Sequence, residues 1–240
     1  MPEKNKKYRR SEQTRHRILK AATREFSERG LAGARIGAIG VAARVNKALL
    51  YYYFHDKEAL YAAALEEVAG KVAENALAVL EKDCSAGERV LRFAVQHFDR
   101  VIGQQEFQSL MQQEMVRFHE GRGGALHILA RKAFGPQFGR LQAIVEEGIR
   151  SGELCNVDWM QMVYAALGAN VFYFLSAPMM RLFSGSDPLQ PSSIATRRTA
   201  AIEFLGNAIF VDRKSGARLA KKVLAAMPMP VSPRMEKKTA

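Results

Sequence analysis

Cysteine is scarce in this chain, which has 240 residues and two cysteines, Cys84 and Cys155. Two thiols so far apart cannot supply a disulfide framework. The first residues are polar and rich in lysine and arginine, without the apolar segment of a signal peptide. We therefore expect a cytoplasmic, reduced protein with two incidental thiols. A redox-sensing pair is the alternative.

Catalytic motifs are also missing. The sequence has no glycine-rich phosphate loop, no His-Glu-x-x-His pair and no nucleophile-elbow pattern. His119 and His127 could be combined with Glu114 or Glu120 as metal ligands, but their spacing is not diagnostic. No apolar-polar alternation lasts long enough for a strand, which predicts an all-α fold. We expect no enzyme activity, no cofactor and no metal.

One long apolar run does occur, over residues 159–180, and it is long enough to cross a membrane. Gln161, Asn170 and Ser176 interrupt this run, and Pro178 lies near its end. A helix that is apolar on all sides can also be buried between other helices. Residues 194–210, with apolar positions at helical spacing, are a candidate neighbour. We expect packing against protein and no membrane; a membrane span is the alternative.

Acidic residues are outnumbered, with 36 Lys and Arg against 24 Asp and Glu and a formal net charge of +12. The excess lies at the two ends. Residues 1–60 hold 14 basic and 6 acidic side chains, residues 61–210 hold 14 and 16, and residues 211–240 hold 8 and 2. A basic segment attracts nucleic acid when it coincides with a DNA-binding motif, and is otherwise a solvated surface.

Such a motif is present in residues 35–57, which are predicted to form two short helices joined by a tight turn. Asn46 is a suitable N-cap for the second helix. Lys47, Ala48 and Tyr51 remain together on its outer face, a surface that fits a DNA major groove. The inward positions recur at helical spacing: Ile36, Ile39 and Ala43 in the first helix, Leu50 and Phe54 in the second.

The same stretch resembles the DNA-binding domain of the TetR family of transcriptional regulators. The family's first helix matches residues 14–30, and its closing pattern of Tyr, Phe, Lys and a later Leu matches Tyr51, Phe54, Lys57 and Leu60. Three positions depart from the pattern: Arg35 replaces a capping Thr or Ser, Gly40 an Ala, and Arg44 a turn Gly. A turn that needs positive φ at Arg44 would be strained.

The resemblance implies a homodimeric, all-α repressor that binds a pseudo-palindromic operator in double-stranded DNA and responds to a small molecule. It implies a basic arm (1–11), a DNA-binding domain (12–72, with the helix-turn-helix at 35–54), a ligand-binding and dimerisation domain (73–212) and a basic, partly disordered tail (213–240). The expected DNA contacts are Arg35, Lys47, Ala48, Leu49, Tyr51, Tyr52, Tyr53 and Lys57, with Lys47 on base edges or phosphate and Lys57 on phosphate.

Two further sites follow from the resemblance. The last two long helices are expected to form a dimer interface through Ala165, Gly168, Ala169, Phe172, Ile202, Leu205 and Ile209. An apolar or amphipathic effector is expected among the Met and aromatic residues of the middle region, namely Phe93, His97, Met111, Met115, Phe118, Phe134 and Phe138. The alternatives are plain core packing of these residues and an architectural DNA binder without an effector.

Local signals predict several boundaries. Ser11 is expected to cap the first helix after a disordered arm, and Gly30 to end it. Asp56 is expected to cap a helix over 57–82, and Ser85 to form a capping box with Glu88. Gly135-Pro136 should interrupt a helix over 125–151. A short basic helix is possible after Val211, followed by a Pro-rich end that either contacts DNA or is solvated.

Overall fold

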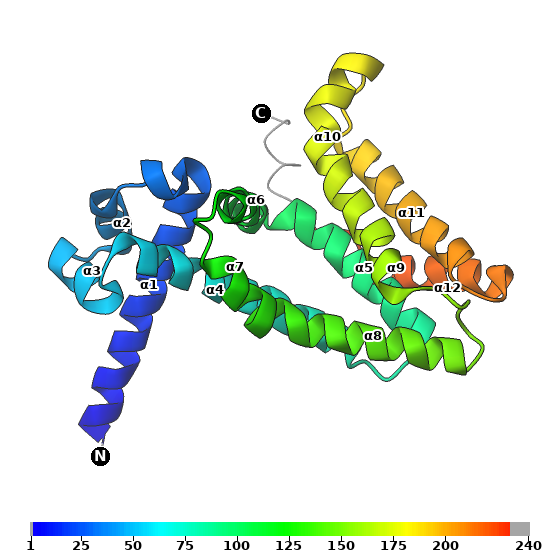
Figure 1. Ribbon diagram of the computed structural model, residues 1–240, viewed down its shortest axis with the longest axis horizontal. Helices are drawn as coiled ribbons and strands as arrows, with labels where there is room; N and C mark the ends of the chain where they lie inside the picture. Colours follow the sequence, from blue (N-terminus) through cyan, green and yellow to red (C-terminus); the bar gives the residue numbers. More distant parts are fainter. Residues whose placement is uncertain (1, 231–240) are drawn as a thin grey trace. The chain divides into compact units, whose positions relative to one another are not determined.

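The computed structural model describes residues 2–230, and within them the fold is all-α, as predicted (Figure 1). The only β-type pairing in this range is an isolated antiparallel bridge between Leu154 and Phe210. The helices, in chain order, are α1 Pro2–Gly33, α2 Ile36–Ala43, α3 Lys47–Phe54, α4 Lys57–Leu80, α5 Ala86–Gly103, α6 Gln105–His119, α7 Ala125–Leu129, the π-helix η1 Ala130–Phe134, α8 Gly135–Arg150, α9 Trp159–Val163, the π-helix η2 Tyr164–Gly168, α10 Ala169–Ser184, α11 Pro191–Ala208 and α12 Arg213–Ala226.

The chain forms two compact units. The first comprises Met1–Ala73 with Gln105–Gly135, and the second comprises Glu74–Gln104 with Pro136–Ala240. In the first unit, Phe26 of α1 and Ile39 and Leu50 of the helix-turn-helix share one core with Leu110 of α6 and Leu129 of α7. Residues 105–135, which we expected in the regulatory domain, therefore pack with the helix-turn-helix.

The first helix is longer than predicted. It begins at Pro2, so the expected disordered arm and the expected N-cap at Ser11 are both wrong. The physical reason is that proline suits the first turn of a helix and no helix-breaking residue follows before Gly30. Gly30 does break the helix, with φ 68° and ψ 172°, and Leu31–Gly33 add one last turn.

In the second unit, α12 is an integral part of the core. Ala220 and Val223 of α12 are fully buried with Ile202 of α11 and Val90 of α5. The short basic helix predicted after Val211 is confirmed as α12, but it is not part of a tail, because every third or fourth residue is apolar or small and packs inward. The part of the expected tail at 231–240 lies outside the described residues.

The other boundary predictions hold, and two of them need refinement. Asp56 Oδ1 accepts from the N–H of Ala59 at 2.6 Å, so Asp56 caps α4. Ser85 Oγ accepts from the N–H of Glu88 at 3.2 Å, but the Glu88 carboxylate pairs with Arg92 and Lys222, so only half of the capping box forms. The helix predicted over 125–151 is interrupted near Gly135-Pro136, as expected, but by the π-helix η1 directly before these residues. The wider turn of a π-helix accommodates the missing N–H of proline.

Candidate nucleic-acid interface

The backbone geometry of the helix-turn-helix agrees in part with what the sequence predicted. Asn46 Oδ1 accepts from the N–H of Leu49 at 2.8 Å and caps α3, as predicted. Arg44 closes α2 in the left-handed region, at φ 56° and ψ 48°, so the predicted strain is present. Gly40 lies under this turn, where an added Cβ would come within 3.0 Å of the Val45 carbonyl oxygen.

The outer face of α3 presents the side chains that the motif predicted. Lys47, Ala48, Leu49 and Tyr51 are exposed, while Leu50 and Phe54 on the opposite face are buried. The Lys47 ammonium lies 5.7 Å from the centre of the Tyr51 ring. A cation over an aromatic ring remains available for base edges or phosphate.

Two of the aromatic residues beside this face differ in their surroundings. The Tyr52 side chain is 81% exposed, which suits a contact with the DNA backbone rather than packing within the protein. The Tyr53 hydroxyl lies 2.9 Å from Ser11 Oγ, so it ties α3 to α1. Tyr53 is therefore held within the unit, a contact that the sequence reasoning did not foresee, since the two residues are far apart in the chain.

The flanking cations are also held in place. The Lys57 ammonium donates to the Ala32 carbonyl at 3.1 Å. Arg35 makes no side-chain cap to α2, and its side chain is exposed. The backbone N–H of Arg35 donates to Glu25 Oε1 at 3.0 Å. Arg44 is also exposed, at the turn between α2 and α3. We did not include Arg44 among the expected DNA contacts, although a basic residue inside a DNA-binding motif is a signal for phosphate contact.

The first unit also contains a buried polar cluster. Glu114 of α6 is 1% exposed and its Oε1 accepts from the N–H groups of Ala125 and Leu126, at 3.0 and 3.2 Å, at the start of α7. Burial of the Tyr61 hydroxyl is the main cause that raises the pKa of Tyr61 well above its usual range, and the negative charge of Glu114 is the second. The guanidinium of Arg117 lies 5.6 Å from the Tyr61 ring centre. The cluster thus joins α4, α6 and α7.

The residues that we expected to bind an effector are divided between the two units. Met111, Met115, Phe118 and Phe134 belong to the first unit, whereas Phe93, His97 and Phe138 belong to the second. Within their units, Phe93, His97 and Met111 are buried, and Met115 and Phe118 are exposed. Phe118 and His127 contact each other with ring centres 5.1 Å apart.

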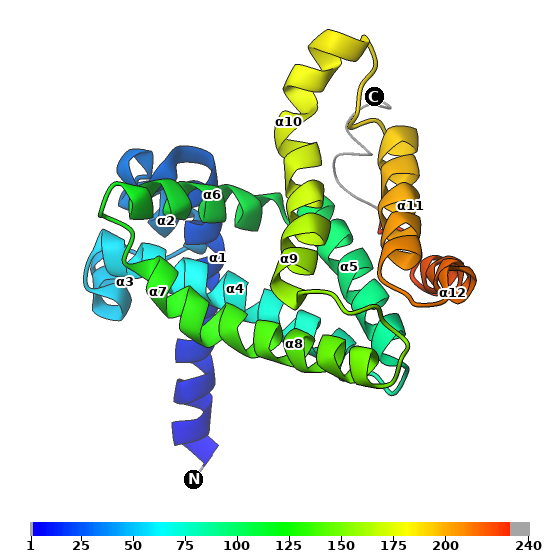
Figure 2. The ribbon, with the colours of Figure 1, turned by 45° about the vertical axis from the view of Figure 1, so that its right-hand side comes forward.

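A groove of about 540 Å³ lies in the second unit between α9–η2–α10 and α11, which are neighbours in the ribbon (Figure 2). It is lined by several residues that we expected at a dimer interface: Ala165 and Ala169 on one side, and Ile202, Leu205 and Ile209 on the other. The last three are buried in the core of the unit, so they form the floor. Gly168 and Phe172 are exposed beside it.

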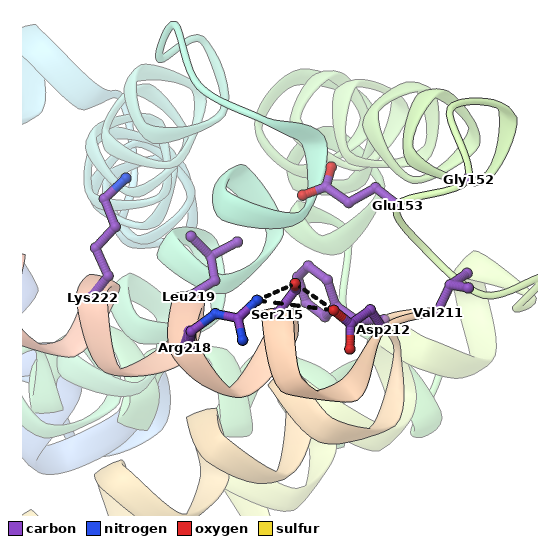
Figure 3. Close-up of a pocket in the computed structure, with 9 residues that line it drawn as sticks. Gly152, Glu153, Val211, Asp212, Ser215, Arg218, Leu219 and Lys222 are labelled. Carbon is purple, nitrogen blue, oxygen red and sulfur yellow. Dashed lines mark hydrogen bonds and ion pairs between the residues drawn. The ribbon is translucent and has the colours of Figure 1, made fainter.

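A second depression, of about 700 Å³, lies at the start of α12 (Figure 3). Its polar groups satisfy one another: Ser215 Oγ donates to Asp212 at 2.6 Å, and Arg218 donates to Ser215 Oγ at 2.6 Å. Glu153 at its other side accepts from Ser85 Oγ at 2.6 Å and from the N–H of Gly87 at 3.0 Å. These groups stabilise the N-terminal ends of α5 and α12.

Three general features complete the description of residues 8–230. No group of three or more His, Cys, Asp or Glu side chains among them is arranged to hold a metal. One helical stretch, Trp159–Ser184, is long and apolar enough to cross a membrane by length and composition, and 28% of its apolar window is buried. Both cysteines are free thiols.

Two protein-family models match the chain. Residues 18–64 match the model described as bacterial regulatory proteins, tetR family, and residues 87–205 match the tetracyclin repressor-like C-terminal domain. The HTH-type transcriptional repressor NicS of Pseudomonas putida is 33% identical over 143 residues, which are 59% of this chain and 66% of that protein.

Two further proteins are similar. The HTH-type transcriptional repressor SCO4008 of Streptomyces coelicolor is 48% identical over 56 residues, 23% of this chain and 29% of that protein. A transcriptional regulator of Saccharomonospora viridis, solved in complex with choline, has the same fold with a TM-score of 0.66 and 17% identity over 82% of this chain and 97% of its own.

Proposed function

This chain belongs to the TetR family of bacterial regulatory proteins, and from this premise we propose that it is a transcriptional repressor that binds operator DNA and is released by a small molecule. The observation that carries the proposal is the outer face of α3. Lys47, Ala48, Leu49 and Tyr51 are exposed together on a capped helix that is braced by α2. The protein would act in the cytoplasm and without catalysis.

Each DNA-facing side chain has a role that its chemistry supports. Lys47 donates to guanine edges or phosphate, and Ala48 and Leu49 contact thymine methyl groups. Tyr51 and Tyr52 donate to phosphate oxygens. Arg35 and Lys57, near the N-termini of α2 and α4, add positive charge where the helix dipoles already favour an anion. Tyr53 acts by holding α3 against Ser11.

A homodimer is part of the proposal because the second unit exposes apolar side chains along one face of η2 and α10. Phe172 is 63% exposed, and the same face carries Tyr164, Gly168, Leu175 and Met179. A contiguous apolar face of this kind is typical of a protein interface. A second copy on a two-fold axis would place two α3 helices about one DNA turn apart, roughly 34–36 Å.

A membrane would also cover this face, and the two possibilities predict different behaviour. A membrane-spanning helix must leave nothing polar exposed to lipid. Gln161 is exposed, and Arg181 pairs with Asp187 at the end of α10 at 2.7 Å. Both features favour a protein partner over lipid. Recovery of the full-length protein only with detergent would argue against the dimer.

The experiment that tests the function is selection from a pool of random DNA duplexes, followed by affinity measurement on the selected site. We expect a two-fold symmetric site, bound at least about a thousandfold more tightly than random duplex at the same salt concentration. Equal affinity for all duplexes would favour the architectural rival. No DNA binding at low salt would contradict the proposal altogether.

A further inference from the structure

Helix α12 carries a strong positive charge. Residues 213–226 hold five basic side chains and no acidic one, whereas residues 61–210 hold 14 basic and 16 acidic side chains. The two family models match residues 18–64 and 87–205, so α12 lies outside both matched ranges. Neither the proposed operator contact at α3 nor the packing of α12 in the core uses this charge.

Four of the cations form a row on the solvent side of the helix. They are exposed and follow one another at i, i+4, i+7 and i+8, the spacing of one helix face: Lys214, Arg218, Lys221 and Lys222. The opposite face, at Ala220, is buried in the core of the second unit. At 1.5 Å per residue the row is about 12 Å long, so a ligand that matches it carries several negative charges.

Most hydrogen-bond donors of this row are unused within the described residues. Neither Lys214 nor Lys221 forms an ion pair within residues 8–230. The Arg218 side chain is 71% exposed, and the carboxylate that pairs with it, Asp212, lies 3.9 Å away. The guanidinium has five N–H donors and gives one of them to Ser215 Oγ, at 2.6 Å. The row can therefore donate to an incoming anion without breaking the fold.

Lys222 is the cation of the row that has a close carboxylate. Its ammonium lies 2.8 Å from Glu88 Oε2, and Oε1 of the same carboxylate pairs with Arg92 at 2.6 Å. One negative charge is thus shared by two cations. The Lys222 side chain remains 65% exposed and gives one of its three donors to Glu88. Because the ammonium is already held in place, it loses less side-chain freedom when a second carboxylate binds.

The row borders the depression of about 700 Å³ at the start of α12, and Arg218 and Lys222 belong to the lining of that depression (Figure 3). The exposed apolar part of the lining is aliphatic. Val211 is 62% exposed and Leu219 is partly buried, whereas Phe210 is 3% exposed. We call the depression and the four cations together the α12 surface. It combines an aliphatic patch with positive charge along one side.

Two carboxylates also line the depression, and both are bound at the start of a helix. Asp212 accepts from the N–H of Lys214 at 2.9 Å and from Ser215 Oγ at 2.6 Å, and Glu153 accepts from the N–H of Gly87 at 3.0 Å. Their charge is directed at the positive ends of the dipoles of α12 and α5. An acidic ligand on the outer side of α12 therefore meets the four cations.

We propose that the α12 surface binds an acidic peptide segment of a partner protein, with carboxylates on the row of cations and an aliphatic side chain in the depression. Charge complementarity argues for an acidic partner. The aliphatic lining favours a peptide over a nucleic acid strand, because strand binding uses exposed aromatic rings for base stacking and Phe210 is buried. The α12 surface lies in the second unit and α3 in the first, so this binding goes beyond the proposed operator contact.

The test uses the full-length protein and three labelled synthetic peptides of 14 residues. The first peptide has leucine at every third or fourth position and glutamate elsewhere. The second has glutamine in place of every glutamate, and the third has serine in place of every leucine. Fluorescence anisotropy at low salt should show saturable binding of the first peptide and at least tenfold weaker binding of the other two. Binding should weaken as salt is added, because exposed charges are screened.

Variants then locate the binding site. The double variant Lys214→Gln and Lys221→Gln should bind the glutamate peptide about tenfold more weakly, the scale of two lost surface ion pairs. Glutamine has nearly the helix propensity of lysine, so thermal stability should not change. Val211→Ser should weaken binding about fivefold without changing its salt dependence, since an apolar contact is lost. The matched control is the double variant Lys20→Gln and Lys71→Gln, an equal loss of charge at exposed positions of the first unit, which should leave the peptide affinity unchanged.

Three results would overturn the proposal: no binding of the glutamate peptide at low salt, equal weakening by the two double variants, or a changed operator affinity. The last result, with a salt slope reduced by about one or more in Lys214→Gln and Lys221→Gln, would make α12 a nucleic-acid contact. If α12-dependent peptide binding is found but the protein binds no operator, this inference is supported and the repressor function fails.

Discussion

The Lys57 ammonium lies 3.1 Å from the Ala32 carbonyl oxygen, so the first residue of α4 holds the last turn of α1 in place. Sequence reasoning assigned Lys57 to a phosphate alone. The contact adds a structural role, because an ammonium has three donors and one of them is used within the unit. A lysine fixed in this way meets a phosphate with less loss of side-chain freedom.

The two lysines of the motif should therefore respond differently to removal. Lys57→Met should weaken binding to all duplexes alike, reduce the salt slope by about one per half-site, and lower stability by about 1 kcal/mol. Lys47→Met should leave stability unchanged and alter base preference at one position. Binding curves at several salt concentrations and a selection experiment measure these effects. An unchanged salt slope for Lys57→Met would make its role purely structural.

Relief of backbone strain gives a second prediction. Arg44 adopts φ 56°, a conformation that costs a residue with a Cβ about 1 kcal/mol relative to glycine. Arg44→Gly should therefore raise the free energy of unfolding, measured with urea in the absence of DNA. Ala42→Gly, two residues earlier and inside α2, is the control with opposite sign, with an expected loss of about 0.5–1 kcal/mol. Equal signs for the two changes would contradict the strain argument.

These positions show what the sequence can specify about this fold. The caps at Asn46 and Asp56 depend on neighbours in the chain, and the chemistry of the capping side chains made them predictable. The left-handed conformation of Arg44 was expected only from the family resemblance, in which a glycine occupies this turn. The start of α1 was missed because a basic composition was interpreted as disorder, although it contains no helix breaker. Short-range signals were reliable where side chains bond to nearby backbone.

Contacts between distant residues could not be predicted. Ser11 and Tyr53, or Glu114 and Ala125, meet only because helices pack, and no periodicity encodes such pairs. The effector residues were chosen by residue type, and residue type does not distinguish a cavity wall from a filled core. Alanine is the most frequent residue in the lining of the groove, and an alanine side chain carries no chemical signal.

The packing of α12 gives a third prediction. Gly206 and Gly216 bring α11 and α12 into close contact, and a Cβ on Gly206 would lie 2.8 Å from the Gly216 carbonyl oxygen. Gly216→Ala should separate the helices, lower the free energy of unfolding by about 1–3 kcal/mol and expose α12 to proteases. Gly139→Ala in α8, where nothing lies within 4 Å of the new Cβ, should instead stabilise by up to about 1 kcal/mol. Equal stability of both variants would show that α12 is not docked.

A buried histidine makes stability depend on pH. Burial, and secondarily the Arg100 charge, lower the pKa of His97 to about 3 from a usual value of 6.5. The unfolded chain therefore takes up a proton below pH 6.5 that the folded chain refuses until about pH 3. Stability should fall as the pH drops through this window, by about 2 kcal/mol at pH 5.

His97→Leu should remove that dependence and leave stability at pH 7 unchanged or higher, since Nδ1 has no partner among the described residues. His127→Leu, at an exposed position, is the control and should retain the full dependence. Urea unfolding at pH 7.5 and pH 5 measures both. If the loss at pH 5 persists in His97→Leu, other groups are responsible for it.

The last prediction concerns the proposed dimer and uses a glycine that its own subunit does not constrain. Gly168 is exposed in η2, and nothing lies within 4 Å of a Cβ built there, so Gly168→Arg should fold normally. In a dimer formed by this face, the new guanidinium would be buried without a partner, which costs several kcal/mol per ion. Light scattering at micromolar concentration should show a dimeric wild-type protein and a monomeric Gly168→Arg. Gly139→Arg, equally exposed and equally free of neighbours, should remain dimeric. The monomer should lose most of its operator affinity, because one subunit can contact only one half-site. A dimeric Gly168→Arg protein would place the interface elsewhere on the chain.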